Sequence, residues 1–211
     1  MGTKTALVFT GGAWNPEKIR GTLPENPYII LAADSGYRKA EALGLTPHKL
    51  VGDFDSLFDG KADRTMPENV EIYQSPCEKD ETDTMLACEI AVEAGCEEIL
   101  IIGGTGGRAD HGWSNILYLE NLDKRGIRAL LTDGENRIQV RHDCTVTLPD
   151  RKGYFSVFAL DTCTVTLTGC KYPLTDAKLE RAMPYAVSNE VAGDEACIRL
   201  TGYAVIMESV K

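Results

Sequence analysis

The pattern of hydrophobic positions divides the chain into two parts. In the first part, short apolar runs that end in Gly, Asp or Pro predict strands over 5–12, 28–34, 49–55, 70–76, 97–104 and 128–134. Between several of these runs, the sequence predicts helices over 35–43, 82–94 and 112–124. Two of the strand runs are apolar at consecutive positions, as expected when both faces of a parallel sheet are covered. We therefore expect an open, mostly parallel α/β sheet in this part.

After about residue 137, apolar and polar residues alternate instead. Runs rich in Thr, Val and Tyr are separated by Gly, Pro and Asp turns, at 137–149, 153–161, 163–169 and 195–209. This pattern predicts an antiparallel sandwich or small barrel. The segment 175–183 interrupts the pattern, and we expect a helical turn there. The expected fold is thus an N-terminal α/β domain over 1–140, followed by a C-terminal all-β sandwich domain over 141–211.

Composition and charge narrow the possible functions. With 211 residues, of which 43% are apolar and 26% charged, the chain can bury a proper core. No apolar run approaches the roughly 20 residues of a membrane helix, and the first residues lack a signal-peptide pattern. The net charge of −10 argues against a nucleic-acid partner. It suits a cationic substrate, or a phosphorylated one that a divalent cation bridges to the protein.

Cysteine and histidine spacing gives no sign of a zinc or sulfur site. The seven cysteines form no C-x-x-C pair, and the three histidines do not flank them at zinc spacing. An odd number of cysteines without an export signal predicts reduced thiols and a cytoplasmic location. The sequence assigns no task to these cysteines or to the long stretch 10–27 between the first two strands.

Chemically distinctive residues gather at the carboxyl ends of the predicted strands, which is where ligands bind in open α/β sheets. Asp53 and Asp55 lie on the same side of an extended segment, so their charges repel unless a cation lies between them. Asp80 and Asp83 share a face at the start of a predicted helix. Because Mg²⁺ prefers carboxylates, water and phosphate oxygens, we predict a magnesium site at Asp53, Asp55 and Asp83. The alternatives are a plain turn at 53–55 and a helix N-cap at Asp80.

The segment GGTGGRADH, residues 103–111, follows an apolar strand and precedes a helix. Its glycines let the backbone approach a ligand, and the helix N-terminus offers free amides to an anion. Arg108 fits a phosphate clamp, with an ordinary surface arginine as the alternative. The embedded G-x-G-x-x-A is a weak dinucleotide fingerprint, and it follows the fifth strand rather than the first.

Other candidate ligand-binding residues also have ordinary structural explanations. The triplet 34–36 could bind a nucleotide or simply cap the next helix, and Asn136 lies in a turn where Asn is common. His111, near the start of a predicted helix, could have a direct role or be only a polar neighbour. We expect Trp14 and Trp113 to be packing residues.

Taken together and in order, these motifs resemble the thiamine pyrophosphokinases of the bacterial type along nearly the full length of the chain. The motifs that carry the resemblance are 34–36, 52–56, 80–83, 103–111 with Asn115, and 188–190. The resemblance implies an α/β catalytic domain and a β-sandwich, assembled as a homodimer with thiamine bound between subunits. The implied reaction moves pyrophosphate from ATP to the thiamine hydroxyl with Mg²⁺, and yields AMP and thiamine diphosphate.

The resemblance also implies residue roles, beginning with the metal ligands Asp53, Asp55 and Asp83. We expect ATP contacts from Asp34, Ser35, Gly36, Gly52, Asp53, Gly103, Gly104, Arg108 and Asn136. We expect substrate contacts from Asp80, Asp110, His111, Ser188 and Asn189, of which the resemblance supplies Asp110, Ser188 and Asn189. Catalytic roles are expected for Asp55, Asp83, Arg108 and Asp110, with Asp110 as a candidate general base.

Two other functions stay open at this point. A metal-dependent sugar-nucleotide transferase also uses a D-x-D motif, but it would leave the second acidic cluster and Arg108 unexplained. A non-catalytic sensor of thiamine or nucleotide on the same fold would be expected to lack the metal-binding carboxylates.

Overall fold

The computed structural model describes residues 2–54, 69–74 and 81–210. Its main feature is a nine-stranded sheet in the order β4-β3-β2-β1-β5-β6-β7-β13-β9. Six strands are parallel: β1 (Thr5–Phe9), β2 (Ile29–Ala33), β3 (Lys49–Gly52), β4 (Glu71–Gln74), β5 (Glu98–Ile102) and β6 (Arg128–Thr132). The antiparallel continuation consists of β7 (Asn136–His142), β13 (Tyr203–Val210) and β9 (Gly153–Ala159).

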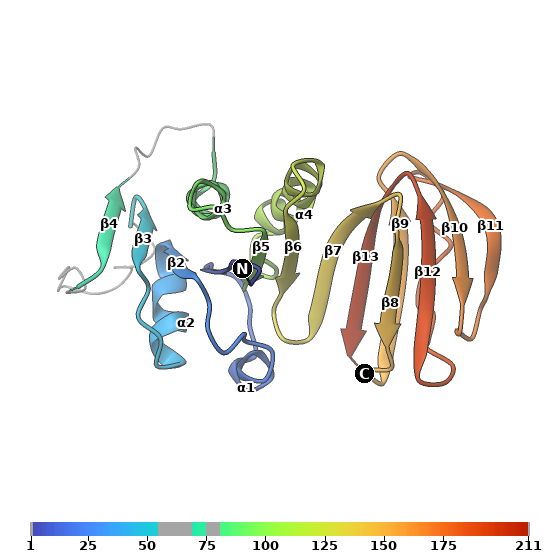
Figure 1. The fold of residues 1–211 in the computed structure, drawn as a ribbon, viewed down its shortest axis with the longest axis horizontal. Helices are drawn as coiled ribbons and strands as arrows, with labels where there is room; N and C mark the ends of the chain where they lie inside the picture. The colour runs from blue at the N-terminus through green and yellow to red at the C-terminus, as the bar shows by residue number, and fades with distance from the viewer. Residues whose placement is uncertain (1, 55–68, 75–80, 211) are drawn as a thin grey trace.

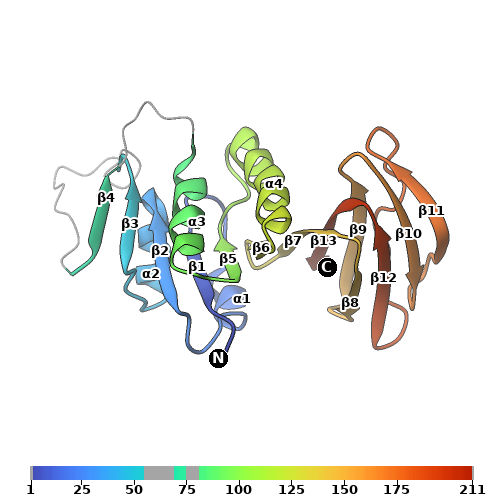
Figure 2. The same ribbon diagram turned by 45° about the horizontal axis from the view of Figure 1, so that its top comes forward.

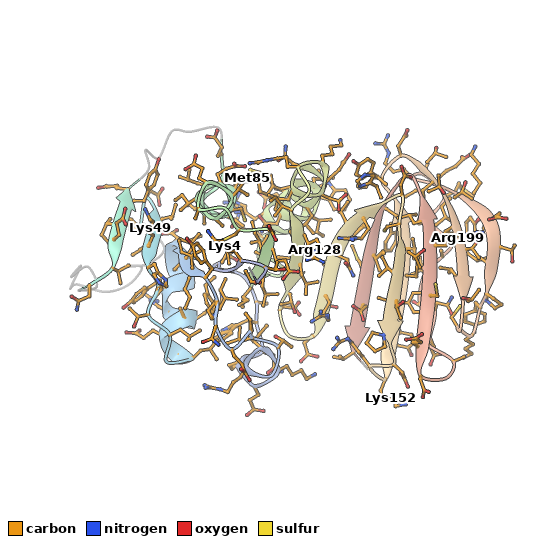
Figure 3. All side chains as sticks on the ribbon, in the orientation of Figure 1. Lys4, Lys49, Met85, Arg128, Lys152 and Arg199 are labelled. Carbon is orange, nitrogen blue, oxygen red and sulfur yellow. The ribbon has the colours of Figure 1, made fainter. Side chains whose placement is uncertain are left out.

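Helices cover both faces of the parallel part of this sheet (Figure 1). On one face lie α3 (Asp83–Glu93) and α4 (Ala109–Lys124); on the other lie α1 (Pro16–Arg20), the 3₁₀ turn η1 (Asp34–Gly36) and α2 (Tyr37–Ala42). Along β1, Ala6 and Val8 pack on the α3/α4 side, whereas Leu7 and Phe9 pack on the opposite side. Side chains fill the spaces between helices and sheet (Figure 3). Double coverage explains why these strands are apolar throughout.

A second, four-stranded antiparallel sheet packs against the far end of the long sheet, opposite β4 (Figure 2). Its strands, in spatial order, are β11 (Leu174–Glu180), β10 (Thr162–Thr168), β12 (Glu195–Thr201) and β8 (Thr145–Pro149). Strand β13 belongs to two cores, because Ala204 and Ile206 face the sandwich while Val205 faces the core under α4. The predicted fold class is confirmed.

Three local expectations were wrong. The segment expected to form a helical turn overlaps β11, in which buried Leu179 pairs with Cys163 of β10; strand pairing overrides its helix-favouring composition. The stretch 10–27 contains α1, which the sequence did not predict. Trp113 is 57% exposed rather than packed.

Helix α3 begins with a different cap from the one considered. Thr82 is its N-cap, and the Thr82 side chain accepts a hydrogen bond of 3.2 Å from the amide of Met85, which Figure 3 labels beside the helix. Asp80 lies outside the described residues. The six described cysteines are all free thiols. Within the ranges that the structure describes, no helix is long and apolar enough to cross a bilayer.

Candidate active site

Three carboxylates converge at the carboxyl ends of neighbouring strands. Asp34 follows β2, Asp53 follows β3, and Asp83 begins α3. One oxygen of each lies within 4.8 Å of the corresponding oxygens of the other two, and all three side chains are half-buried. Like charges this close repel, so a cation held between the three carboxylates would stabilise the arrangement. Carboxylate oxygens are also the ligands that Mg²⁺ prefers, and this donor set therefore fits the ion.

The structure thus brings together two of the three predicted metal ligands, Asp53 and Asp83. The third, Asp55, lies outside the described residues. In its place among the described side chains stands Asp34, which we expected to contact ATP. Sequence reasoning missed that Asp34 joins this cluster, because it depends on β2 and β3 being neighbours in the sheet.

The backbone around the carboxylates adopts uncommon conformations. Asp34 has φ 53° and Phe54 has φ 67°, in the left-handed region that few residues other than Gly occupy. Gly52 has φ 145°, and a Cβ there would lie 3.4 Å from atoms of both Asp34 and Asp83. Such conformations concentrate at functional sites, where the surrounding fold maintains them. At Gly52 it is the backbone conformation that favours glycine, since a Cβ there would make only ordinary contacts with the two carboxylates.

A cavity of about 220 Å³, which we call the glycine cavity, adjoins this acidic cluster. It is lined by Thr10, Gly11, Gly12, Thr84, Gly103, Gly104, Gly106, Gly107, Arg108, His111, Gly112 and Asn115. Thr84 follows Asp83 directly and so connects the cavity to the cluster. Buried Asn115 donates a 2.8 Å hydrogen bond from Nδ2 to the Gly104 carbonyl and holds the loop in place.

Two glycine loops meet in this cavity. The Gly12 amide donates to the Gly103 carbonyl at 2.6 Å, and a Cβ on Gly12 would lie only 2.2 Å from the Thr105 carbonyl oxygen. Only glycine fits at position 12. Arg108, the N-cap residue of α4, makes no side-chain hydrogen bond that caps the helix. Its first amides, together with the glycine backbone, can therefore bind an anion.

Arg108 and Asp110 pair with each other at the mouth of the cavity. Arg108 donates from Nε to Oδ1 of Asp110 at 3.2 Å, and from a terminal nitrogen to Oδ2 of Asp110 at 2.6 Å. Both side chains are largely exposed. Hydrogen bonding from Arg108 lowers the pKa of Asp110 to about 2. A carboxylate that weakly basic is a poor proton acceptor at neutral pH.

Asn136 lies beside a different cavity, of about 570 Å³, which it shares with Asp133, Glu135 and residues 13–17. Its side chain donates to Asp133 at 2.8 Å, and its amide donates to the same carboxylate at 2.6 Å. Burial alone would raise the pKa of Asp133, but these hydrogen bonds outweigh it and lower that pKa. Thr105 also donates to Asp133, at 2.9 Å, and so links this turn to the glycine loop.

The predicted thiamine contacts Ser188 and Asn189 lie on the sandwich and do not line the glycine cavity of their own chain. Asn189 is buried. Its Oδ1 accepts a hydrogen bond from the Tyr172 amide at 3.0 Å, and its Nδ2 donates one to the Tyr172 carbonyl at 2.8 Å. Ser188 is exposed, and its backbone adopts the left-handed conformation, with φ 57°. The side chain of Asn189 therefore shapes the loop that presents Ser188.

Two family descriptions match most of the chain. "Thiamin pyrophosphokinase, catalytic domain" matches residues 22–131, and "Thiamin pyrophosphokinase, vitamin B1 binding domain" matches residues 135–203. The chain belongs to the thiamin pyrophosphokinase family.

Individual members of the family resemble the chain over most or nearly all of its length. The thiamine pyrophosphokinase of Bacillus subtilis (strain 168) is 32% identical over 194 residues, which cover 89% of this chain and 90% of that protein. A crystal structure of thiamine pyrophosphokinase from Bacillus subtilis has a TM-score of 0.84 at 27% identity, and the match covers 99% and 100% of the two chains. A crystal structure of a thiamin pyrophosphokinase family protein from Enterococcus faecalis has a TM-score of 0.79 at 28% identity, and the match covers 99% of this chain and 100% of that one. Family membership does not favour the sugar-nucleotide transferase or the sensor.

Proposed function

We propose that the chain transfers pyrophosphate from ATP to the hydroxyl of thiamine, and releases AMP and thiamine diphosphate. Membership of the thiamin pyrophosphokinase family supports this activity. The observation that carries it is the convergence of Asp34, Asp53 and Asp83 beside a glycine-lined cavity. Transfer of a phosphoryl-type group needs positioning and charge neutralisation more than covalent help from the protein, and this arrangement supplies both.

Asp34, Asp53 and Asp83 would hold the magnesium ion, with Asp55 proposed as a further ligand. When bound, Mg²⁺ neutralises phosphate oxygens and orients the polyphosphate for in-line attack. The three side chains come from separate elements, so the fold itself sets their spacing. Their proposed role is to bind the ion and thereby orient the polyphosphate.

The polyphosphate of ATP would occupy the glycine cavity, where the backbone amides of both loops and the N-terminus of α4 can donate to its oxygens. Arg108 stands at the mouth, and its planar guanidinium suits bidentate contact with a phosphate once it leaves Asp110. Donors placed around the attacked β-phosphorus would stabilise charge that develops there.

We propose that Asp110 contacts the cationic thiamine rather than accepting its proton. Its lowered pKa keeps it ionised at neutral pH, which suits attraction to a cation and opposes general-base catalysis. This differs from the expectation that Asp110 was a candidate base. Among the described residues, the geometry favours no other general base for the thiamine hydroxyl.

We propose that two copies of the chain complete the site, with Ser188 and Asn189 of one subunit facing the glycine cavity of the other. Large apolar side chains are exposed around Ser188, as at surfaces that bind another protein: Tyr172, Met183, Tyr185 and Val187. The division into 1–140 and 141–211 and the cytoplasmic location also remain proposals.

The activity is tested by mixing the protein with ATP, Mg²⁺ and thiamine and measuring AMP and thiamine diphosphate. We expect one AMP for each thiamine diphosphate, and no product when Mg²⁺ is chelated. Binding of both ligands without AMP release would favour the sensor. Mg²⁺-dependent binding of a UDP- or GDP-sugar, with none of ATP, would favour the sugar-nucleotide transferase.

A further inference from the structure

Lys39 extends from α2 toward the underside of the glycine loops, and its burial is unusual for a lysine. Only 7% of its surface is exposed. Its ammonium donates a hydrogen bond to the carbonyl of Thr10, and a Cβ on Gly103 would lie 3.0 Å from Nζ. The ammonium therefore lies where the ends of β1 and β5 meet. Because burying a charge is unfavourable unless it is well compensated, its presence there calls for a functional explanation.

The strand ends at this point are otherwise tied together by Thr10. Its amide donates to the Ile102 carbonyl at 2.9 Å, and its hydroxyl donates to the Gly103 carbonyl at 2.5 Å. Only the Thr10 carbonyl then needs a partner, and Lys39 provides it. Lys39 thus completes the junction that sets the position of both glycine loops.

The hydrogen bond from Lys39 to the Thr10 carbonyl also fixes the orientation of the Gly11 amide. In a trans peptide, the carbonyl and the following N–H point in opposite directions, so the Gly11 amide points away from Lys39. Gly11 lines the glycine cavity and Lys39 does not. Among the hydrogen bonds between described residues, none uses the Gly11 amide. That amide is therefore available to a ligand in the cavity.

We propose that Lys39 is a positioning residue for the polyphosphate: it fixes the Thr10–Gly11 peptide so that the Gly11 amide donates to an anion in the glycine cavity, and it places a positive charge behind that loop. This inference rests on the proposed function, because it takes the triphosphate of ATP as the anion. Burial lowers the pKa of Lys39 to about 8, so the ammonium is still mostly charged at neutral pH.

The test is Lys39→Met, which keeps an unbranched stem but removes the charge and the donor. We expect KM for ATP to rise by about 10-fold or more, the scale of losing a charge-assisted contact, with little change in kcat or in KM for thiamine. Calorimetry with inorganic tripolyphosphate and Mg²⁺ should show a similar loss of affinity. The melting temperature should change little, because relief of the buried charge offsets the loss of the partner of the Thr10 carbonyl.

Lys124→Met is the matched control, since it removes an exposed lysine that pairs with Glu120 on α4 and should leave both affinities unchanged. If Lys39→Met binds tripolyphosphate as tightly as the wild type does, the inference is overturned. A lower melting temperature with unchanged KM for ATP would also overturn it, because Lys39 would then be only structural. Failure of the wild type to form AMP would instead count against the proposed function, and tripolyphosphate binding would still test Lys39.

Discussion

At the scale of single residues, two residues of the proposed site have uncommon backbone conformations. Asp34 and Ser188 both have positive φ, although neither is glycine. The first joins the acidic cluster and the second is exposed on the sandwich, where we propose that it meets thiamine. Such backbone conformations cost stability and persist where the surrounding structure maintains them. Asp143, Lys152 and Asp176, outside the proposed site, share this backbone region, so the conformation alone assigns no function to Asp34 or Ser188.

Asp34→Asn tests the role that the structure gives to Asp34. Asn tolerates the left-handed conformation, so the backbone should persist while one charge is lost. We expect turnover to fall by ~100-fold, the scale of losing one electrostatic stabiliser, with a higher Mg²⁺ requirement. Without Mg²⁺ the melting temperature should hold or rise, because repulsion within the cluster decreases. Asp176→Asn, which changes an exposed strand aspartate paired with Arg199, is the control for a lost carboxylate. Wild-type turnover in Asp34→Asn would contradict the assignment.

The buried lysine also predicts how stability depends on pH. Burial lowers the pKa of Lys39 to about 8 in the folded state, whereas an unfolded lysine titrates near 10.4. Between these values the unfolded chain binds more protons, so folded stability should increase with pH. Relative to Lys39→Met, the wild-type free energy of unfolding should rise by roughly 2 kcal/mol from pH 7.5 to 10, as measured by urea denaturation. A constant difference across this range would show that the lysine is not desolvated.

At the scale of elements, the site depends on loops that approach one another more closely than side chains allow. The loop after β1 and the loop after β5 share hydrogen bonds through Gly12 and Gly103. Neighbouring parallel strands bring these loops together, since β1 pairs with β5 in register from Thr5 to Phe9. The anion-binding backbone is thus a product of strand order.

Gly12→Ala should disrupt this contact. Its Cβ would lie 2.2 Å from the Thr105 carbonyl, so the two loops must separate. We expect a lower melting temperature and at least a ~10-fold loss of ATP affinity, as donors lose their positions. Gly21→Ala in the same segment is the control, because its nearest neighbour lies at 3.8 Å and its φ is −74°. Equal behaviour of the two variants would mean that the loop contact is not needed.

At the scale of the whole molecule, the long sheet connects the α/β part to the sandwich. β13 places alternate side chains in two cores, so the orientation of the sandwich is set by packing rather than by a flexible linker. Within one chain, Ser188 nevertheless does not reach the glycine cavity. The proposed site, which combines Ser188 with the glycine cavity, would therefore need a second copy of the chain.

Mixed dimers of Asp83→Asn and Ser188→Arg test whether the site is shared. Each variant alone should be nearly inactive, the first through loss of a metal ligand and the second through repulsion of cationic thiamine. If the subunits exchange randomly, about a quarter of all sites combine two intact halves, and activity should recover to about that level. The measurement is AMP release after co-refolding. No recovery, with mixed dimers demonstrated by mass, would place the whole site within one chain.

The sequence alone determined the fold class and the edge of the sheet at which the carboxylates and the glycine loops gather. Both follow from local patterns: continuous apolar runs indicate doubly covered strands, and alternation indicates a sandwich. It also singled out Asp53, Asp83 and the glycine loop, because carboxylates and glycines at strand ends have a chemical meaning in any such fold.

Only the tertiary structure decided which of these residues meet. Asp34 joined the carboxylates because β2 lies beside β3, and Lys39 reached Thr10 because α2 packs under β1. The segment 174–180 became a strand because a pairing partner outweighed its own preference. These outcomes depend on contacts between residues distant in sequence, and on the free energy of burying them together, which no local pattern encodes.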